Sequence, residues 1–138
     1  MTGKPFFDTN VVLYAFTSRA SASSDTRAEK AEELLNLGGI VSVQVLNEFA
    51  DIAVHKLKFT WDAVERGLNA VTELCGRAFP LDAETHNLAI ALSKRYGFRI
   101  YDSLIVAAAE QAGCETLYSE DLHHGQSIGK VKIVNPFL

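Results

Sequence analysis

Four acidic residues are placed so that their carboxylates could share one site: Asp8, Glu48, Asp102 and Asp121. Taken singly, each has a simpler explanation as a helix cap, a turn residue or a solvated surface acid. Hard divalent cations such as Mg²⁺ and Mn²⁺ prefer oxygen ligands, whereas zinc sites usually contain His or Cys. Four carboxylates without clustered His or Cys therefore favour a Mg²⁺ or Mn²⁺ site, provided that the fold brings them together.

The acids are placed where an open α/β sheet would gather them. Asp8 directly follows a predicted strand, and Asp121 comes just after another that ends at Tyr118. Glu48 lies one turn into the helix after a third strand, on the flank of that helix's apolar stripe. In open α/β sheets, ligands bind beyond the carboxyl ends of the strands. We therefore expect these side chains to face one crevice.

Asp102 begins the most apolar predicted helix, which ends at Gly113. Residues 104–109 are all aliphatic or Ala, so they surround the helix with apolar side chains and predict that it is buried. A carboxylate in the first turn of a buried helix is partly desolvated and needs a partner. A cation at the strand ends would provide one.

The elements that position these acids alternate along the chain. Apolar runs predict strands at Pro5–Phe7, Gly39–Val43, Glu115–Tyr118 and Val131–Val134, with Phe79–Leu81 as a possible fifth. Helices are predicted from Asp25 or Thr26 to Leu37, over Gln44–Leu57, from the Thr60 cap to Cys75, over Ala83–Tyr96 after the Asp82 cap, and from Asp102 to Gly113. The Ser- and Ala-rich segment Thr17–Ser24 is predicted to be a loop. This alternation predicts a three-layer α/β/α sandwich with a central, mainly parallel sheet of four or five strands.

The bulk composition fits this architecture. The chain has 138 residues, which suits a single domain spanning residues 1–138. Its net charge of −4 argues against a large phosphate-gripping surface, although an acidic metal pocket would itself lower the net charge. Cys75 and Cys114 have no metal-ligand spacing and imply no disulfide framework. We expect no signal peptide, no membrane segment and a cytoplasmic location.

Four blocks of sequence around the acids, taken together and in order, resemble the PIN-domain family. The toxin branch of that family, the VapC-type ribonucleases of type II toxin–antitoxin modules, is the most similar. The resemblance extends from Phe6 to Phe137 and is carried by Phe7-Asp8-Thr9-Asn10-Val11-Val12-Leu13-Tyr14-Ala15, Ser42-Val43-Gln44-Val45-Leu46-Asn47-Glu48-Phe49, Tyr101-Asp102-Ser103-Leu104-Ile105-Val106-Ala107-Ala108-Ala109, and Leu117-Tyr118-Ser119-Glu120-Asp121-Leu122-His123-His124-Gly125-Gln126.

This resemblance implies a PIN-like fold and a Mg²⁺- or Mn²⁺-dependent endoribonuclease. Asp8, Asp102 and Asp121 would be metal ligands, and Glu48 would act through water or at a second metal. The resemblance also implies a cognate antitoxin, an RNA substrate and a homodimer. Many members carry a further acid two residues after the fourth, where this chain has His123. Asn10 and Ser119 match positions that support the site, which completes the set of candidate site residues.

Basic residues are needed beside an acidic centre if RNA is to approach it, and two other functions stay open. The basic candidates are Lys94, Arg95, Arg99, Lys130 and Lys132, although each is also explained as surface charge. A phosphohydrolase could use Asp8 as a covalent nucleophile, but such sites want an acid two residues later, where Asn10 stands. A non-catalytic PIN-like binding module is the other alternative. The helix around Thr60 carries Phe59, Trp61, Val64 and Leu68, which predict either a dimer surface or core.

Overall fold

The structure is a computed structural model that describes residues 3–20 and 26–138. Within those residues the helices are α1 (Thr9–Ala20), α2 (Thr26–Leu37), α3 (Val43–His55), α4 (Trp61–Cys75), α5 (Ala83–Tyr96) and α6 (Ile100–Gln111). The strands are β1 (Phe6–Phe7), β2 (Thr116–Tyr118), β3 (Ser127–Ile128) and β4 (Val131–Val134).

The strands form one mixed sheet in the order β1-β2-β4-β3. β1 pairs in parallel with β2, and β2 pairs in parallel with β4, whereas β3 runs antiparallel to β4. The register places Phe7 opposite Tyr118, so the residues that follow these two strands leave the sheet at the same edge. This confirms the prediction of a central, mainly parallel sheet.

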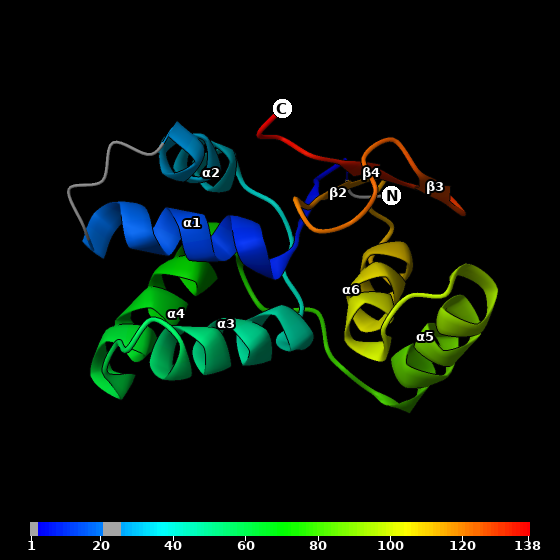
Figure 1. Ribbon diagram of the computed structural model, residues 1–138, viewed down its shortest axis with the longest axis horizontal. Helices are drawn as coiled ribbons and strands as arrows, with labels where there is room; N and C mark the ends of the chain where they lie inside the picture. Colours follow the sequence, from blue (N-terminus) through cyan, green and yellow to red (C-terminus); the bar gives the residue numbers. More distant parts are fainter. Residues whose placement is uncertain (1–2, 21–25) are drawn as a thin grey trace.

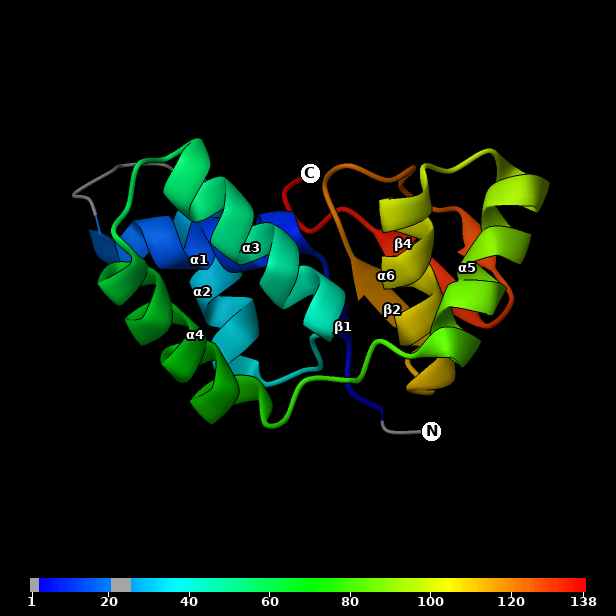
Figure 2. The same ribbon diagram turned by 90° about the horizontal axis from the view of Figure 1, so that it is seen from below.

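Helices cover the sheet from both sides. Helices α5 and α6 lie together beside β2 and β4, while α1, α2, α3 and α4 gather on the other half of the molecule (Figures 1 and 2). Helix α6 packs against β2, β4, α3 and α5 and is buried at every position from 103 to 109. The prediction from its continuous apolar sequence is confirmed.

Two predicted helix caps are confirmed in atomic detail. The Thr60 hydroxyl accepts a hydrogen bond from the backbone N–H of Ala63 at 3.1 Å, at the start of α4. The Asp82 carboxylate accepts from the N–H of Thr85 at 2.9 Å, at the start of α5. Each side chain satisfies an N–H that the first turn of a helix leaves unpaired.

Two predicted helix boundaries are wrong. Helix α6 begins at Ile100, so Asp102 lies inside the first turn and is not its cap. Helix α1 continues to Ala20, which contradicts the predicted loop from Thr17; the rest of that predicted loop, 21–24, lies outside the described residues. Packing of Phe16 against Phe49 and Phe59, with ring centroids 5.1 and 4.8 Å apart, overrides the weak local preference of the segment.

Two predictions about strands also need correction. The segment Gly39–Val43, predicted as a strand, lies beside β1 but pairs only through isolated parallel bridges, Phe6 with Ile40 and Ser42 with Phe79. The possible fifth strand at Phe79–Leu81 is reduced to the second of these bridges. Strand β3 was not predicted, because its two residues are too short to give a pattern of alternation.

The apolar residues near Thr60 divide between core and surface. Val64 is buried at 1 % exposure, so it belongs to the core, whereas the Trp61 side chain is 61 % exposed. Phe59 and Leu68 are partly buried against the core. Within residues 3–20 and 26–138, no helix is both long enough and apolar enough to span a membrane.

The close approach of Gly39 to β1 gives a test of how the site edge is built. A Cβ atom at position 39 would overlap the Phe7 ring and lie 2.8 Å from the Pro5 carbonyl oxygen. We expect Gly39→Ala to lower the free energy of unfolding by about 1–3 kcal/mol, because a packed ring must move. Urea denaturation measures this change in the free energy of unfolding. Leu37→Ala is the control, since Leu37 is 84 % exposed and should change little; equal stability of the two variants would contradict this packing.

Candidate metal-binding active site

Asp8 is the centre of the candidate site and is almost completely buried. Its backbone N–H donates to the carbonyl oxygen of Tyr118 at 3.0 Å, which continues the β1–β2 pairing to the end of the strand. The side chain then turns into the start of α1, where Oδ1 accepts from the Thr9 N–H at 2.6 Å. Its exposed fraction is 4 %. Asp8 therefore lies at the strand end, as its position in the sequence indicates.

Ser119 joins the ends of the two neighbouring strands. Its hydroxyl donates to Asp8 Oδ2 at 2.7 Å and accepts from the backbone N–H groups of Asp121 and Leu122, each at 3.2 Å. The residue is fully buried. One hydroxyl thus fixes both the Asp8 carboxylate and the turn that carries Asp121.

Asn10 bridges two of the acids. Its amide Nδ2 donates to Asp121 Oδ2 at 3.1 Å and lies 3.4 Å from Asp8 Oδ2. Its Oδ1 accepts from the Glu120 N–H at 3.2 Å. Because both Asp8 oxygens already accept hydrogen bonds and the residue is buried, Asp8 has little access as a covalent nucleophile, which disfavours the phosphohydrolase alternative.

Glu48 reaches the same region from α3. The Thr9 hydroxyl donates to Glu48 Oε2 at 3.4 Å, so Thr9 contacts Asp8 through its N–H and Glu48 through its side chain. Burial, followed by the negative charge of Asp8, raises the pKa of Glu48 to about 7. Thr9 and Glu48 are 39 residues apart along the chain, which explains why no local pattern could reveal this contact.

Asp102 lies in the first turn of α6 and is paired with a cation from its own chain. The Arg99 guanidinium Nε lies 3.4 Å from Asp102 Oδ2, and the Asp102 side chain is 23 % exposed against 75 % for Arg99. The charge of Asp102 adds to the repulsion felt by both Asp8 and Glu48. The four predicted acids therefore lie within electrostatic reach of a common centre.

The pKa of Asp8 shows the cost of this arrangement. Burial, together with the charges of Asp121 and Asp102, raises this pKa to about 6 in spite of hydrogen bonds from Ser119 and Thr9 that lower it. A carboxylate in such surroundings is stabilised either by a proton or by a bound cation.

A donor set made only of oxygen atoms, in which the pKa values of Asp8 and Glu48 are raised, suits a hard divalent cation in its chemistry. The geometry is less complete. Among the residues that the structure describes, no three His, Cys, Asp or Glu side chains are arranged closely enough to hold one ion. Asn10 and Arg99 occupy positions between and beside the acids, so ligands would have to move toward a bound ion.

A second network, not predicted from the sequence, holds the turn that follows β2. The Tyr14 hydroxyl of α1 donates to the Glu120 carboxylate, and Arg27 Nη1 of α2 lies 3.0 Å from that hydroxyl and 3.2 Å from Glu120 Oε1. The Arg27 guanidinium also covers the Tyr14 ring at 4.8 Å. These contacts orient the segment between Ser119 and Asp121 from the side of α1 and α2.

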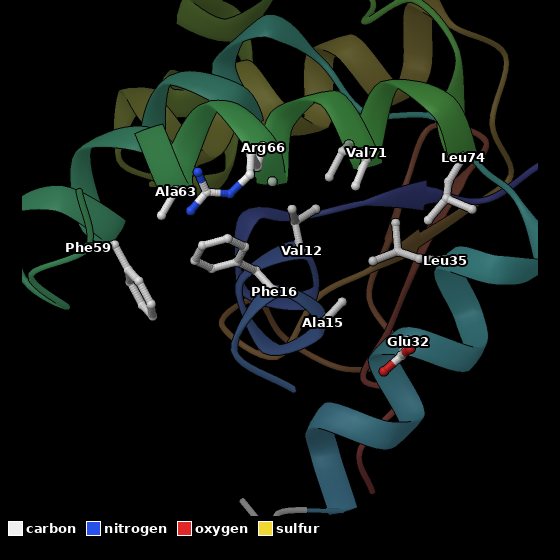
Figure 3. Close-up of a pocket in the computed structure, with 12 residues that line it drawn as sticks. Val12, Ala15, Phe16, Glu32, Leu35, Phe59, Ala63, Arg66, Val71 and Leu74 are labelled. Carbon is white, nitrogen blue, oxygen red and sulfur yellow. The ribbon is translucent and has the colours of Figure 1, made fainter. Parts of the chain in front are cut away.

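An apolar groove lies apart from the acids, between α1, α2 and α4. Its volume is about 430 Å³, and Figure 3 shows side chains from the three helices facing one another across it. Glu32 and Arg66 stand at its margin. The apolar lining is formed by Val12, Ala15, Phe16, Leu35, Phe59, Ala63, Gly67, Ala70, Val71 and Leu74.

The comparisons with known proteins agree with the fold and with the order of these elements. The family model of the PIN domain matches residues 6–126, which include all four acids. The chain belongs to the PIN-domain family. A comparison with curated protein sequences finds no match.

Solved structures with the same fold include toxins and toxin–antitoxin complexes. The crystal structure of Mycobacterium tuberculosis VapC20, described as a Sarcin-Ricin loop cleaving toxin, is 17 % identical, with a TM-score of 0.66 over 85 % of this chain and 89 % of that one. A toxin–antitoxin complex from Klebsiella pneumoniae is 18 % identical, with a TM-score of 0.69 over 96 % and 97 %. VapBC2 from Rickettsia felis, bound to a DNA fragment from their promoter, is 18 % identical, with a TM-score of 0.64 over 94 % and 96 %. These similarities confirm the PIN fold over nearly the whole chain.

The raised pKa values give this PIN domain a characteristic pH dependence of stability. Asp8 rises from 3.8 to about 6 and Glu48 from 4.5 to about 7, so each carboxyl holds its proton more tightly in the folded state. The unfolded chain releases these protons first, and the metal-free protein should therefore lose stability as the pH rises from about 4 to about 7. For Asp8 the loss is on the order of 3 kcal/mol above pH 6.

Asp8→Asn should remove that part of the pH dependence. The free energy of unfolding, measured with chelator present, should shift in favour of the variant as the pH rises from about 4 to about 8. Asp82→Asn is the control, because hydrogen bonds from Thr85 lower the pKa of Asp82 below its ordinary value of 3.8. Asp82 is therefore already ionised in both states over this range, and the difference between Asp82→Asn and wild type should stay constant. A difference between Asp8→Asn and wild type that stays constant across this range would contradict the burial of a strained Asp8 carboxylate.

Proposed function

We propose that this PIN domain is a Mg²⁺- or Mn²⁺-dependent endoribonuclease and the toxin of a toxin–antitoxin pair. The observation that carries the proposal is the convergence of Asp8, Glu48, Asp102 and Asp121 at one edge of the sheet, with Asp8 buried at their centre. Raised pKa values at such a cluster are more expected at a functional site than at a structural one. Similarity in fold to VapC20, described as a cleaving toxin, supports the choice of RNA as substrate.

The residues divide into those that would hold the cation and those that orient them. Asp8, Asp102 and Asp121 would be its ligands, and the bound cation would activate water and neutralise charge on the phosphate. Ser119 and Asn10 fix the carboxylates of Asp8 and Asp121 by the hydrogen bonds already described. Glu48, with its pKa raised to about 7, is suited to accept a proton from the attacking water near neutral pH.

Cleavage of RNA by purified protein tests this proposal directly. We expect cleavage with Mg²⁺ or Mn²⁺ that stops when the metal is chelated, because the acidic cluster cannot bind phosphate by itself. Asp8→Asn, Glu48→Gln and Asp102→Asn should each lower the cleavage rate about 100-fold or more. Gel analysis of labelled RNA at a fixed metal concentration provides the measurement.

Asp51→Asn is a matched control for these variants. Asp51 is an exposed carboxylate on α3, the same helix as Glu48, and it lies 3.7 Å from His55 at the surface. Its substitution should leave cleavage unchanged. Wild-type rates in folded Asp8→Asn and Asp102→Asn would eliminate the metal mechanism, and an inactive but folded wild type would favour the non-catalytic binding module.

We also propose that the antitoxin occupies the apolar groove with an amphipathic helix. The groove offers the apolar surface of three helices, and Glu32 and Arg66 at its margin suit charged residues of both signs on such a partner. The toxin–antitoxin complexes among the structures of similar fold support the choice of partner. The homodimer stays a prediction from the family resemblance, and the sedimentation coefficient of the purified protein would measure it.

Growth of cells that express the chain tests the partner surface. Expression alone should arrest growth, and the cognate antitoxin would be identified as the small protein of the same genome that relieves the arrest. We expect Leu74→Asp to abolish relief, because it places a charge in the groove. Leu81→Asp is the matched control, since both leucines are 37 % exposed and Leu81 lies outside the groove. If the antitoxin relieves the growth arrest caused by Leu74→Asp as completely as that caused by Leu81→Asp, the antitoxin binds outside the groove.

A further inference from the structure

An acidic centre must be accompanied by positive charge if it is to bind an RNA backbone. Four carboxylates lie together here, and the whole chain has a net charge of −4. Even with a cation bound, phosphates on either side of the cleaved bond would meet negative potential. A basic side chain close to the acids is therefore needed to bind these phosphates.

Arg99 is the basic candidate that the structure places directly against the acids. Its guanidinium lies 3.4 Å from Asp102 Oδ2. The hydrogen bond to Asp102 and then the charges of Asp102, Glu48 and Asp121 raise the pKa of Arg99, so the side chain feels three of the four acids. The Arg99 side chain is 75 % exposed, and an ion pair at that exposure stabilises the fold little. Stability alone does not account for an arginine here.

Tyr101 adds an exposed aromatic ring next to this arginine. It is 56 % exposed, although it lies in the first turn of a helix that is buried at every position from 103 to 109. Tyr101 and Ser103 stand about 100° to either side of Asp102 on the helix. Ser103 faces α5, where its hydroxyl lies 2.7 Å from that of Ser93. Tyr101 is therefore turned away from α5.

The segment before Asp102 fixes these two side chains on a rigid support. Tyr96 and Phe98 stack with ring centroids 5.5 Å apart, and the guanidinium of Arg95 covers the Tyr96 ring at 5.3 Å. Gly97, with a φ of +77°, ends α5 and allows the tight turn into α6. Arg99 thus lies in a short, packed connection and Tyr101 in the first turn of α6, and neither lies in a long loop.

We propose that Arg99 and Tyr101 form an RNA-contact pair beside the metal centre, which rests on the proposed function. Arg99 binds a phosphate next to the cleaved bond. Its guanidinium leaves the Asp102 carboxylate and pairs with the RNA backbone, because it can form paired hydrogen bonds with either a carboxylate or a phosphate. Tyr101 stacks on the base of an adjacent nucleotide. Stacking on an exposed ring requires a base that is free of a duplex, so the pair selects unpaired RNA.

Binding of fluorescein-labelled RNA measures the two roles separately. Asp8→Asn protein with Mg²⁺ keeps the RNA intact, and a single strand of about ten nucleotides is compared with the same strand annealed to its complement. We expect Arg99→Ala to weaken binding of both RNAs about tenfold. The slope of log affinity against log salt concentration should also become shallower, by the amount expected for the loss of about one phosphate contact. Arg99→Lys should restore most of the salt dependence.

Tyr101→Ala should behave differently. It should weaken binding of the single strand about tenfold, leave the salt dependence unchanged and leave duplex binding unchanged, while Tyr101→Phe binds like the parent. Trp61→Ala and Arg77→Ala are the matched controls, because both residues are exposed and lie on or next to α4. Neither control should change RNA binding, and thermal melting shows that every variant is folded.

The outcomes separate this inference from the proposed function. If wild type cleaves RNA while Arg99→Ala and Tyr101→Ala bind both RNAs like the parent, the contact pair is wrong and the ribonuclease stands. If the pair governs binding as described while wild type never cleaves, the chain is an RNA-binding module. Equal losses on single-stranded and duplex RNA for Tyr101→Ala would overturn the stacking role.

Discussion

Burial of the Asp8 carboxylate is the constraint on which the rest of the site depends. A carboxylate that is 4 % exposed and near three more acids is costly in its charged form, unless donors or a cation stabilise it. One donor is the N–H of the next residue, Thr9, and the other is the hydroxyl of Ser119, which is 111 residues from Asp8 along the chain. The end of β1, the start of α1 and the end of β2 must therefore meet at one point.

That requirement explains why so short a sheet is held so firmly. Strand β1 contributes only Phe6 and Phe7, yet both are fully buried and lie between the β2 strand and the bridge at Ile40. Gly39 lets the bridge approach the Phe7 ring. On the other side, α6 is buried against β2 and β4 and presents Asp102 at its exposed end. Packing in the core thus decides where carboxylates stand at the edge.

The sequence predicted those features that depend on neighbours along the chain. Local patterns of apolar and capping residues indicate the strand ends at Phe7 and Tyr118, the caps Thr60 and Asp82, and the burial of α6. The boundaries of α1 and α6 were mispredicted because tertiary packing, such as that of Phe16, determined them. The acids Asp8 and Asp121 could be placed at one edge by the topology rule, whereas Asp102 was included because its helix was expected to be buried.

What could not be predicted is the set of contacts between distant segments. Nothing near Arg27 marks it as a partner of Glu120, and nothing near Asn10 marks its amide as a bridge to Asp121. Such contacts depend on how α1 and α2 lie against the turn after β2, and a single sequence carries no pattern of that kind. The positions of the acids could be predicted, and the family resemblance marked Ser119 and Asn10 as supporting residues, but the contacts that these donors make could not be predicted.

Helix α1 connects the two surfaces of the molecule. Its first turn carries Asn10 beside the acids, its middle carries Tyr14 against Glu120, and Val12 and Phe16 line the apolar groove. A helix moves as a nearly rigid unit, so a partner that shifts α1 from the groove would also shift the amide that bridges Asp8 and Asp121. The acidic site and the groove differ in chemistry and in location, yet both are built on α1. A displacement of α1 would therefore move Asn10 and Tyr14 at the acidic site together with Phe16 in the groove.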